Sequence, residues 1–368
     1  MNNSLKNKIT VFLLGGTLLA LTLACWFKPT TEYSDSERRA LAAFPTLTTE
    51  TISSGKFMSE FETYTLDQFP LRDTFRGIKS FSTLYLFGEA EVNDLYIYDG
   101  YVTKAEYPLV QPMIDNAAKK FQFLYDNYMA DKDVNVYLSI VPDKNFFAGE
   151  RDHQLSMDYE ALVNSMKEQS PYMEYIDIFP TLSLENYYYT DTHWKQETLL
   201  PTAQTLAQAM GAELATEYTT NTLTEDFEGV YYGQLALPLK PDTLQYLTND
   251  ILNSCIVTSY NTGKPVEREM YDLSKADSKD PYEMYLCGND ALVTIENPAA
   301  TTDKELIIFR DSFGSSIAPL LATGYRKVTL VDIRYINSAM LGYFVEFNGQ
   351  DVLFLYSTLV LNSSTSFK

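Results

Sequence analysis

The chain has 368 residues, of which 45% are hydrophobic, and a formal net charge of −21. The apolar content is ample for a packed core and excludes global disorder, and the length indicates two or three domains or one domain with a large insertion. The acidic balance argues against nucleic acid or an anionic lipid surface as a partner, because binding to either needs basic patches.

The first predicted element is an export segment at residues 1–27. Residues 9–27 are uncharged and mostly apolar and follow Lys6 and Lys8, so the amino end would stay in the cytoplasm and the remainder would lie outside. The stretch is at the lower limit for a spanning helix and longer than most signal-peptide cores. We expect an extracytoplasmic protein held by an uncleaved membrane anchor. A cleaved signal peptide or a lipidated Cys25 are the alternatives, and both would release the segment.

The next segments alternate between helical and strand patterns. Residues 28–56 are polar and indicate a tether, and apolar positions at helical spacing follow over 57–88. Leu95–Tyr98 before Asp99-Gly100 predicts a hairpin. An amphipathic helix over 110–130 then precedes a buried strand over Val134–Val141. Helix followed by apolar strand, repeated, implies a parallel sheet, so residues 57–219 are predicted to be the first part of an α/β domain.

The middle of the chain predicts a shorter strand, a loop and a change of pattern. Tyr175–Phe179 is a strand candidate, and a helix over Glu197–Met210 is ended by Gly211. From about 220 to 300, short strands with glycine and proline between them replace helices. We interpret this segment as an inserted β-rich lobe beside the site, after which residues 301–368 complete the α/β domain.

A serine follows the most apolar strand of that last part. Leu306–Phe309 is a continuous apolar run, Asp311-Ser312 ends it, and an apolar helical pattern to Thr323 follows. A serine at a strand-to-helix turn exposes its hydroxyl at the carboxyl edge of the sheet, near free backbone N–H groups. The alternative is that the serine only caps the helix, or that Asp311 does. Two further strands are predicted, over Lys327–Ile333 and Val352–Tyr356.

A histidine with an aspartate beside it is the second chemical signal. The chain has two histidines, His153 and His193, and the first lies in a polar stretch typical of a surface. Asp191 is two residues before His193, so an extended segment would send both side chains to the same side. The carboxylate would orient the ring and stabilise the imidazolium. Trp194 would limit water at the site. The alternative is a loop histidine with Asp191 as a helix cap.

Together these stretches resemble the DHHW family, which is similar to the SGNH-hydrolase-like periplasmic proteins that acetylate alginate. The resemblance covers roughly residues 33–360 and departs from the family at Thr192, where the family has a second histidine. Arg38 also stands where an asparagine is usual. The matching motifs, in the family's order, are SERRALAAFP at 36–45, DQFPLR at 67–72, VPDKN at 141–145, DTHW at 191–194, GVYYG at 229–233, CGN at 287–289, DSF at 311–313 and VDIR at 331–334.

The resemblance implies an SGNH-hydrolase-like parallel sheet flanked by helices, with the serine after the Asp/His pair in a circularly permuted order. It implies that Ser312 attacks an acyl carbonyl, His193 takes its proton, and Asp191 holds the ring. The backbone N–H of Ser312 or a neighbour would stabilise the oxyanion. The acyl group would pass to a cell-surface or secreted polysaccharide, and a multi-pass membrane acyltransferase would supply it. A carbohydrate esterase and a non-catalytic glycan-binding protein are the alternatives.

Three further residues are candidates for substrate binding. Arg334 ends the strand after the serine helix, at the edge where α/β proteins bind ligands, although an ion pair with Asp332 would explain it equally. Lys144 ends another strand, where a solvated lysine is the default. Asn289 would be a side-chain donor or a turn residue.

The cysteines and the remaining motifs predict no metal and no cofactor. No C-x-x-C motif or His/Cys cluster occurs in the sequence, so a structural zinc site is not expected. Cys255 and Cys287 are equally compatible with one extracellular disulfide and with two thiols.

Overall fold

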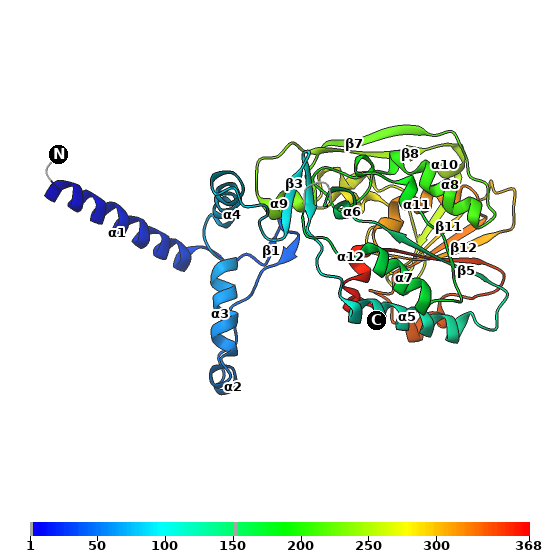
Figure 1. The fold of residues 1–368 in the computed structure, drawn as a ribbon, viewed down its shortest axis with the longest axis horizontal. Coiled ribbons are helices and arrows are strands. Elements are labelled where there is room, and N and C mark those ends of the chain that lie inside the picture. Colours follow the sequence, from blue (N-terminus) through cyan, green and yellow to red (C-terminus); the bar gives the residue numbers. More distant parts are fainter. Residues whose placement is uncertain (1–2, 150–153) are drawn as a thin grey trace. The chain divides into compact units, whose positions relative to one another are not determined.

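The computed structural model of the chain describes residues 3–149 and 154–368 (Figure 1). His153 therefore lies outside the described residues. Contacts divide the chain into two compact units, an amino-terminal unit (Met1–Val92 with Tyr232–Pro238) and a sheet unit (Asn93–Tyr231 with Leu239–Lys368). The sequence prediction began the α/β domain at residue 57, whereas the helices of 57–88 have their contacts mainly within the amino-terminal unit.

The amino-terminal unit begins with a long apolar helix, α1 (Asn3–Phe27). It is long and apolar enough to cross a membrane, a property that signal sequences near an amino terminus share. The short antiparallel strands β1 (Tyr33–Ser34) and β2 (Arg39–Ala40) follow in the predicted tether. The remaining helices are α2 (Thr49–Ser53), α3 (Lys56–Asp67) and α4 (Arg72–Phe81), which continues into a π-helical turn over Ser82–Leu86.

The sheet unit is built on an eight-stranded sheet in the order β10-β9-β11-β13-β12-β14-β5-β6. The strands from β13 to β6 run parallel, and β11, β9 and β10 add antiparallel pairs at one side. Their bounds are β5 (Asn135–Val141), β6 (Glu174–Tyr175), β9 (Ile256–Ser259), β10 (Val266–Arg268), β11 (Leu292–Glu296), β12 (Glu305–Arg310), β13 (Lys327–Val331) and β14 (Asp351–Ser357). The predicted α/β class with a mainly parallel sheet is therefore confirmed.

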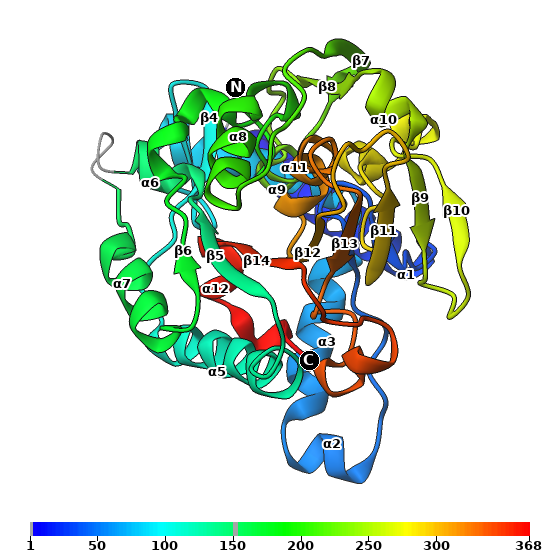
Figure 2. The same cartoon turned by 90° about the vertical axis from the view of Figure 1, so that its right-hand side faces the viewer.

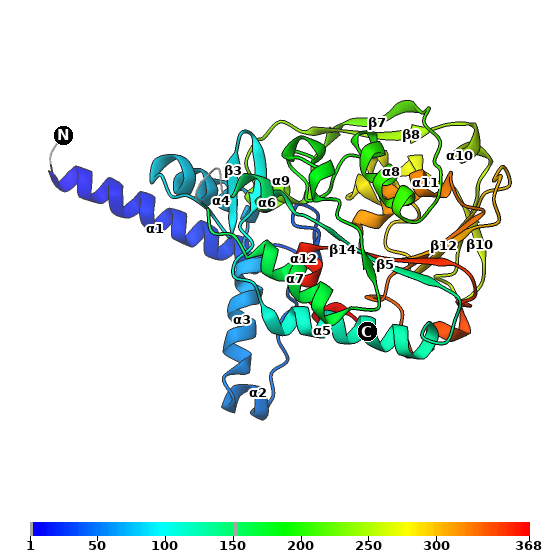
Figure 3. The ribbon, with the colours of Figure 1, turned by 45° about the vertical axis from the view of Figure 1, so that its right-hand side comes forward.

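Helices cover both faces of this sheet, as buried apolar strands require. Figure 2 and Figure 3 show α8 (Leu200–Ala209) and α11 (Phe313–Ala322) on one face, and α5 (Gln111–Tyr128) and α7 (Tyr159–Gln169) on the other. Alternate residues of β12 enter the two cores: Leu306 and Ile308 pack with α8 and α11, and Ile307 and Phe309 with α5 and α7. The short helices of the sheet unit are α6 (Lys144–Ala148), α10 (Asp250–Ser254) and α12 (Thr358–Leu361). The residues of α9 (Val230–Leu235) are divided between the two units at Tyr231.

Several local predictions differ from the structure. The strand predicted over Tyr175–Phe179 is limited to β6, because a 3₁₀ turn containing Pro180 follows at Phe179–Thr181. The helix predicted from Glu197 begins at Leu200, after the 3₁₀ turn Gln196–Thr198.

The β-rich segment 220–300 does not form a lobe of its own. It contains a hairpin of β7 (Thr219–Phe227) and β8 (Asp242–Thr248), while β9, β10 and β11 extend the main sheet. The other hairpin, β3 (Leu95–Tyr98) with β4 (Tyr101–Lys104), lies where the sequence predicts it. Cys255 and Cys287 are free thiols.

Candidate active site

The hydroxyl of Ser312 and the His193–Asp191 pair meet in one chain of hydrogen bonds. Ser312 Oγ lies 2.8 Å from His193 Nε2, and His193 Nδ1 lies 2.6 Å from Asp191 Oδ1. Asp191 is fully buried, and the side chain of His193 is 12% exposed. Two segments 119 residues apart thus place a serine hydroxyl, an imidazole and a buried carboxylate within hydrogen-bonding distance of one another.

The turn that carries Ser312 is held by Asp311. Ser312 occupies the N-cap position of α11, but its side chain makes no capping hydrogen bond. Asp311 does this instead, since its Oδ1 accepts from the backbone N–H of Phe313 at 3.0 Å. Asp311 Oδ2 accepts from the backbone N–H and the hydroxyl of Ser357, at 2.8 and 2.7 Å. The aspartate therefore caps the helix and joins the turn to the end of β14, which leaves the serine hydroxyl free to meet the imidazole.

One backbone donor remains available at this turn. The backbone N–H of Phe313 donates to the side chain of Asp311, and the backbone N–H of Gly314 donates to the Asp311 carbonyl at 3.1 Å. In the part of the chain that the structure describes, the N–H of Ser312 donates no hydrogen bond to the protein. It is therefore free to donate to an oxyanion formed beside the hydroxyl.

The Asp191–His193 segment is bent, so the prediction that an extended backbone aligns the two side chains is wrong. Asp191 Oδ1 accepts from the backbone N–H of His193 at 3.0 Å as well as from the ring. Such a local turn is common for aspartate. Asp191 Oδ2 accepts from the backbone N–H of Val230 at 2.8 Å. The carboxylate is thus fixed on both oxygens before it orients the ring.

The loop before Asp191 is held by a second buried carboxylate and a glycine. Asp242 accepts from the backbone N–H groups of Tyr189 and Thr190, both at 2.8 Å, and from the Thr190 hydroxyl at 2.7 Å. The N–H of Gly229 donates to the same hydroxyl at 3.0 Å. A Cβ at Gly229 would lie 2.4 Å from the Thr190 carbonyl and 2.5 Å from Asp191 Cα, which explains a glycine here.

Gly229→Ala is expected to destabilise the fold by about 1–3 kcal/mol, because the added methyl group forces this loop to move. Activity should fall further than the stability loss explains, since Asp191 moves with the loop. Chemical denaturation and rate measurements on the same preparation check this. Gly16→Ala is the control, because Gly16 lies within the helix α1 and no atom is within 4 Å of its added Cβ. Equal activities of the two variants would contradict the prediction.

Trp194 joins the histidine loop to the serine helix rather than lining the site. Its indole N–H donates to the carbonyl of Phe313 at 3.1 Å and to the hydroxyl of Ser316 at 2.8 Å, and the side chain is fully buried. The predicted role as a wall against water is therefore replaced by a bracing role. This contact fixes the spacing between the imidazole and the first turn of α11.

Sequence reasoning missed Tyr282, whose ring packs against one face of the His193 imidazole. The rings of Tyr282 and His193 are stacked, with centroids 3.9 Å apart and planes inclined by 9°. The Tyr282 hydroxyl donates to Ser316 Oγ at 2.8 Å. Tyr282 lies 89 positions after His193 in a segment with many tyrosines, so no local pattern marks it.

Lys144, a candidate for substrate binding, is buried, so the alternative of a solvated strand-end lysine is wrong. Its Nζ donates to the carbonyls of Tyr188 and Tyr189, at 3.0 and 3.3 Å, and lies 5.0 Å from the centre of the Tyr231 ring. Burial lowers its pKa to about 7, against the opposing effect of Asp191 and Asp242. The lysine thus holds the backbone just before Asp191.

We expect the free energy of unfolding to rise with pH between about 7 and 8.5, and Lys144→Met to flatten that rise. The unfolded lysine keeps its proton up to about pH 10.4, whereas the buried one releases it near pH 7. The unfolded state therefore binds more protons in this window, which stabilises the fold as pH rises. Denaturant titrations at several pH values measure the slope, with the exposed Lys167→Met as control. Identical slopes in the wild type and Lys144→Met would refute this.

The other two substrate-binding candidates are engaged within the protein. Arg334 forms a two-pronged ion pair with Asp332, with Nε–Oδ1 at 2.9 Å and Nη2–Oδ2 at 2.6 Å, as the alternative interpretation anticipated. Asn289 is exposed and donates to Glu283 Oε1 at 3.0 Å. Neither contact joins these residues to Ser312 or His193. Among the described residues, no group of three or more His, Cys, Asp or Glu could hold a metal ion.

Arg310 is a second residue that sequence reasoning passed over. It lies two positions before Ser312, and its side chain is fully buried under α11. Its Nη2 donates to the carbonyls of Gly288 and Asp290, at 3.3 and 3.2 Å. Burial lowers its pKa from the usual value for arginine. The guanidinium therefore ties the turn at 288–290 to the serine strand.

Solved structures of other proteins share this fold. A DHHW family protein from Eubacterium siraeum DSM 15702 matches with a TM-score of 0.58 and 18% identity, over 75% of this chain and 94% of that one. Bacillus cereus PatB1, in a structure with a sulfonyl adduct, matches with a TM-score of 0.55 and 17% identity, over 73% and 97%. The O-acetyltransferase domain of Pseudomonas putida AlgJ matches at 0.45 with 13% identity over 73% and 92%, which supports no further conclusion.

No family model matches the sequence, and no curated protein matches it. The structural match to the Eubacterium siraeum protein confirms the predicted resemblance to the DHHW family at the level of the fold.

Proposed function

We propose that this protein is an SGNH-type serine acyltransferase that moves an acyl group, most simply acetyl, onto a polysaccharide outside the cytoplasm. The observation that carries the proposal is the unbroken hydrogen-bond chain from Asp191 through His193 to Ser312. A buried carboxylate, an imidazole and a serine hydroxyl in this order are the parts of covalent acyl transfer, whatever their order in the sequence.

The hydrogen bonds assign the roles of the two ring nitrogens. Nδ1 carries the proton, because Asp191 can only accept, so Nε2 is free to accept the Ser312 proton. The Ser312 oxygen adds to the acyl carbonyl while its proton moves to Nε2, and Asp191 stabilises the resulting imidazolium. The Ser312 N–H donates to the carbonyl oxygen as it becomes negative; a donor of this kind is typically worth about 3–4 kcal/mol in the barrier.

The second half of the reaction reverses these roles. Collapse of the tetrahedral species breaks the bond to the leaving group, which takes the proton from His193 and departs. A sugar hydroxyl then loses its proton to Nε2 and attacks the acyl-serine, so Ser312 regains its proton when the ester forms on the sugar. Tyr282 and Trp194 support this cycle by keeping the imidazole and the serine helix at fixed separation.

The choice of a polysaccharide as acceptor rests on the motif resemblance and on export. α1 would place the sheet unit outside the cytoplasm. Cell-surface glycans are accessible there, and acetyl-coenzyme A is not. A multi-pass membrane acyltransferase is therefore the proposed acyl supplier. Arg334, Lys144 and Asn289 are not needed for the chemical step, because each is engaged within the protein; their predicted contact with substrate remains a prediction.

An acyl-serine trap tests the function. The full chain is incubated with an activated acetyl ester, quenched with acid and digested, and acetylation is expected on the peptide that contains Ser312. A sulfonyl fluoride added first should block the acetylation and modify the same peptide, as a reagent that captures activated serines. No modification of that peptide by either reagent would leave only the glycan-binding alternative.

The fate of the trapped acetyl group separates the two enzymatic alternatives. A transferase is expected to deliver more acetyl to an added oligosaccharide than to water, and an esterase to deliver it to water whether or not the sugar is present. Quantifying acetylated sugar and free acetate from one reaction decides between them.

A further inference from the structure

The fourth helix of the amino-terminal unit, α4, turns its apolar side to solvent and its charged side into the unit. Soluble helices turn their apolar side inward. On α4 and the turn that follows, however, Phe75, Ile78 and Phe81 are 43%, 56% and 57% exposed, and Leu86 is 69% exposed. Leu71, at the start of α4, is 68% exposed. We call these five side chains the α4 face.

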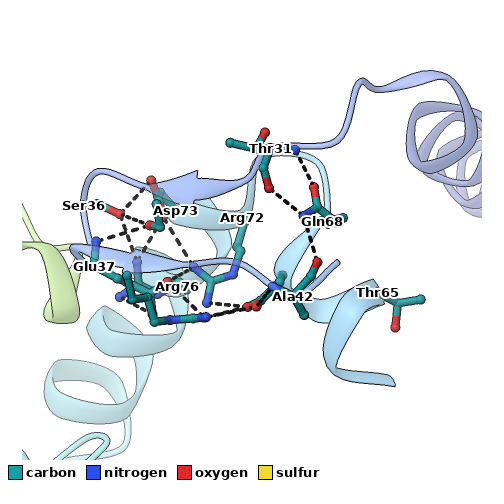
Figure 4. A network of polar contacts seen from close by, with 12 residues as sticks. Thr31, Ser36, Glu37, Ala42, Thr65, Gln68, Arg72, Asp73 and Arg76 are labelled. Atoms are coloured by element: carbon teal, nitrogen blue, oxygen red, sulfur yellow. Dashed lines mark hydrogen bonds and ion pairs between the residues drawn. The ribbon is translucent and has the colours of Figure 1, made fainter. Parts of the chain in front are cut away.

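The charged side of α4 is directed into the unit instead (Figure 4). Arg76 Nη2 donates to the carbonyls of Gly233 and Gln234, at 2.9 and 2.8 Å, and Arg72 pairs with Glu37. Gly77 approaches so closely that a Cβ there would lie 2.5 Å from the carbonyl oxygen of Ala236. Ion pairs and a close backbone contact thus fix the rotation of α4, and the apolar side cannot turn inward.

A neighbouring ion pair stiffens the same unit. Arg39 binds both carboxylate oxygens of Asp67, at 3.0 and 2.6 Å, and this hydrogen bonding lowers the pKa of Asp67. Asp67 also accepts from the backbone N–H of Ala42 at 2.9 Å. The tether after α1 is therefore attached to the turn between α3 and α4.

This attachment keeps the α4 face close to the end of α1. Thr31 is hydrogen-bonded through both its N–H and its carbonyl to the side chain of Gln68, at 2.9 and 2.8 Å. α1 ends at Phe27, and four residues span at most about 14 Å. The turn from which α4 starts therefore lies within that distance, plus the length of the Gln68 side chain, of the point where α1 would leave a membrane.

The charge distribution permits contact with lipid at this place. Residues 1–92 contain nine Lys or Arg and ten Asp or Glu, so nearly all of the net charge of −21 lies in the rest of the chain. The overall acidity that argues against a lipid partner thus does not apply to this unit. A helix that exposes its apolar side is typical of helices that lie in the interfacial layer.

We propose that the α4 face lies in the interfacial layer of the membrane that α1 crosses, so that the amino-terminal unit rests on the lipid instead of hanging from a free tether. The proposal rests on retention of α1 as an anchor and is independent of the acyl-transfer chemistry. We favour lipid over a protein as the occupant. The hydrogen bonds between Thr31 and Gln68 hold the α4 face beside the bilayer in every copy of the chain.

Photo-cross-linking in the full chain tests the proposal. The probe amino acid p-benzoylphenylalanine replaces Phe81 on the α4 face or, as control, Lys79, which is exposed about 160° around the same helix. The protein is placed in nanodiscs of phosphatidylethanolamine and phosphatidylglycerol and irradiated. We expect the probe at position 81 to form adducts with lipid and the probe at position 79 to form none.

Three results would overturn the proposal: equal adducts at both positions, adducts at position 81 with a second copy or with another part of the chain, and adducts with another protein in native membranes. Quenching of Trp26 by brominated lipid tests the anchor separately, because Trp26 lies in α1 and the other tryptophan, Trp194, is buried. Quenching without lipid adducts refutes the α4 face alone. No quenching refutes the anchor and the face together, while leaving the acyl-serine trap untouched.

Discussion

Ser312→Ala is expected to lower the rate of acyl transfer by about 10⁶-fold, because the attacking atom is removed while the fold is kept. The hydroxyl makes no capping hydrogen bond, and Asp311 holds the turn without it. Initial rates with an activated acetyl ester and an oligosaccharide measure the loss. The free energy of unfolding of the variant, measured by thermal denaturation, should stay within about 0.5 kcal/mol of the wild-type value.

The matched control is Ser315→Ala, three residues further along α11, because His193 Nε2 is bonded to Ser312 and not to this serine. The double variant Ser312→Ala with His193→Ala adds a sharper criterion. Residues that act as one unit lose their effect together, so the double variant should be no slower than Ser312→Ala alone. Additive losses, or transfer at more than a tenth of the wild-type rate in Ser312→Ala, would contradict the mechanism.

Asp191→Asn is expected to reduce kcat by about 10⁴-fold with little change of geometry. The asparagine carbonyl can keep the hydrogen bond from the Val230 N–H, while its N–H₂ group takes the place of Oδ1 and gives up the bond from the His193 N–H. The amide cannot stabilise an imidazolium as the carboxylate does, and its N–H₂ group favours the tautomer with the proton on Nε2. That tautomer cannot take the Ser312 proton.

The pH-rate profile and a spectroscopic measurement separate this explanation from simple misfolding. ¹⁵N chemical shifts of His193 should report the proton on Nδ1 in the wild type and on Nε2 in Asp191→Asn. A variant that retains the wild-type tautomer but loses activity would mean that the carboxylate acts in another way. A loss below tenfold would mean that Asp191 only holds the loop.

Elements with strong local patterns could be predicted from the sequence. The apolar runs of β5, β12 and β14, the Asp99-Gly100 hairpin turn and the periodic pattern of α5 are each visible within a short window. Asp191, His193 and Ser312 could be selected too, because D-T-H-W at 191–194 and D-S-F at 311–313 resemble the motifs of the DHHW family in the family's order. Their roles in chemistry remain proposals, while their contact is now observed.

The contacts that support the triad could not be predicted, because they join segments far apart in the chain. The tyrosine stacked on His193 comes from a turn 89 residues later, and Gly229, which packs against Thr190, lies 39 residues after it in the chain. The burial of Lys144 has the same origin. A lysine after a strand is solvated unless another loop covers it, and here the carbonyls of Tyr188 and Tyr189 do so.

The position of β14 has a consequence for how the protein comes into being. This strand follows the other strands in the sequence but lies between β12 and β5, and Ser357 at its end holds the aspartate next to Ser312. A chain emerging amino end first must keep a gap in its sheet until this segment arrives. The turn that carries Ser312 therefore reaches its observed hydrogen bonding only when residues 351–357 are in place.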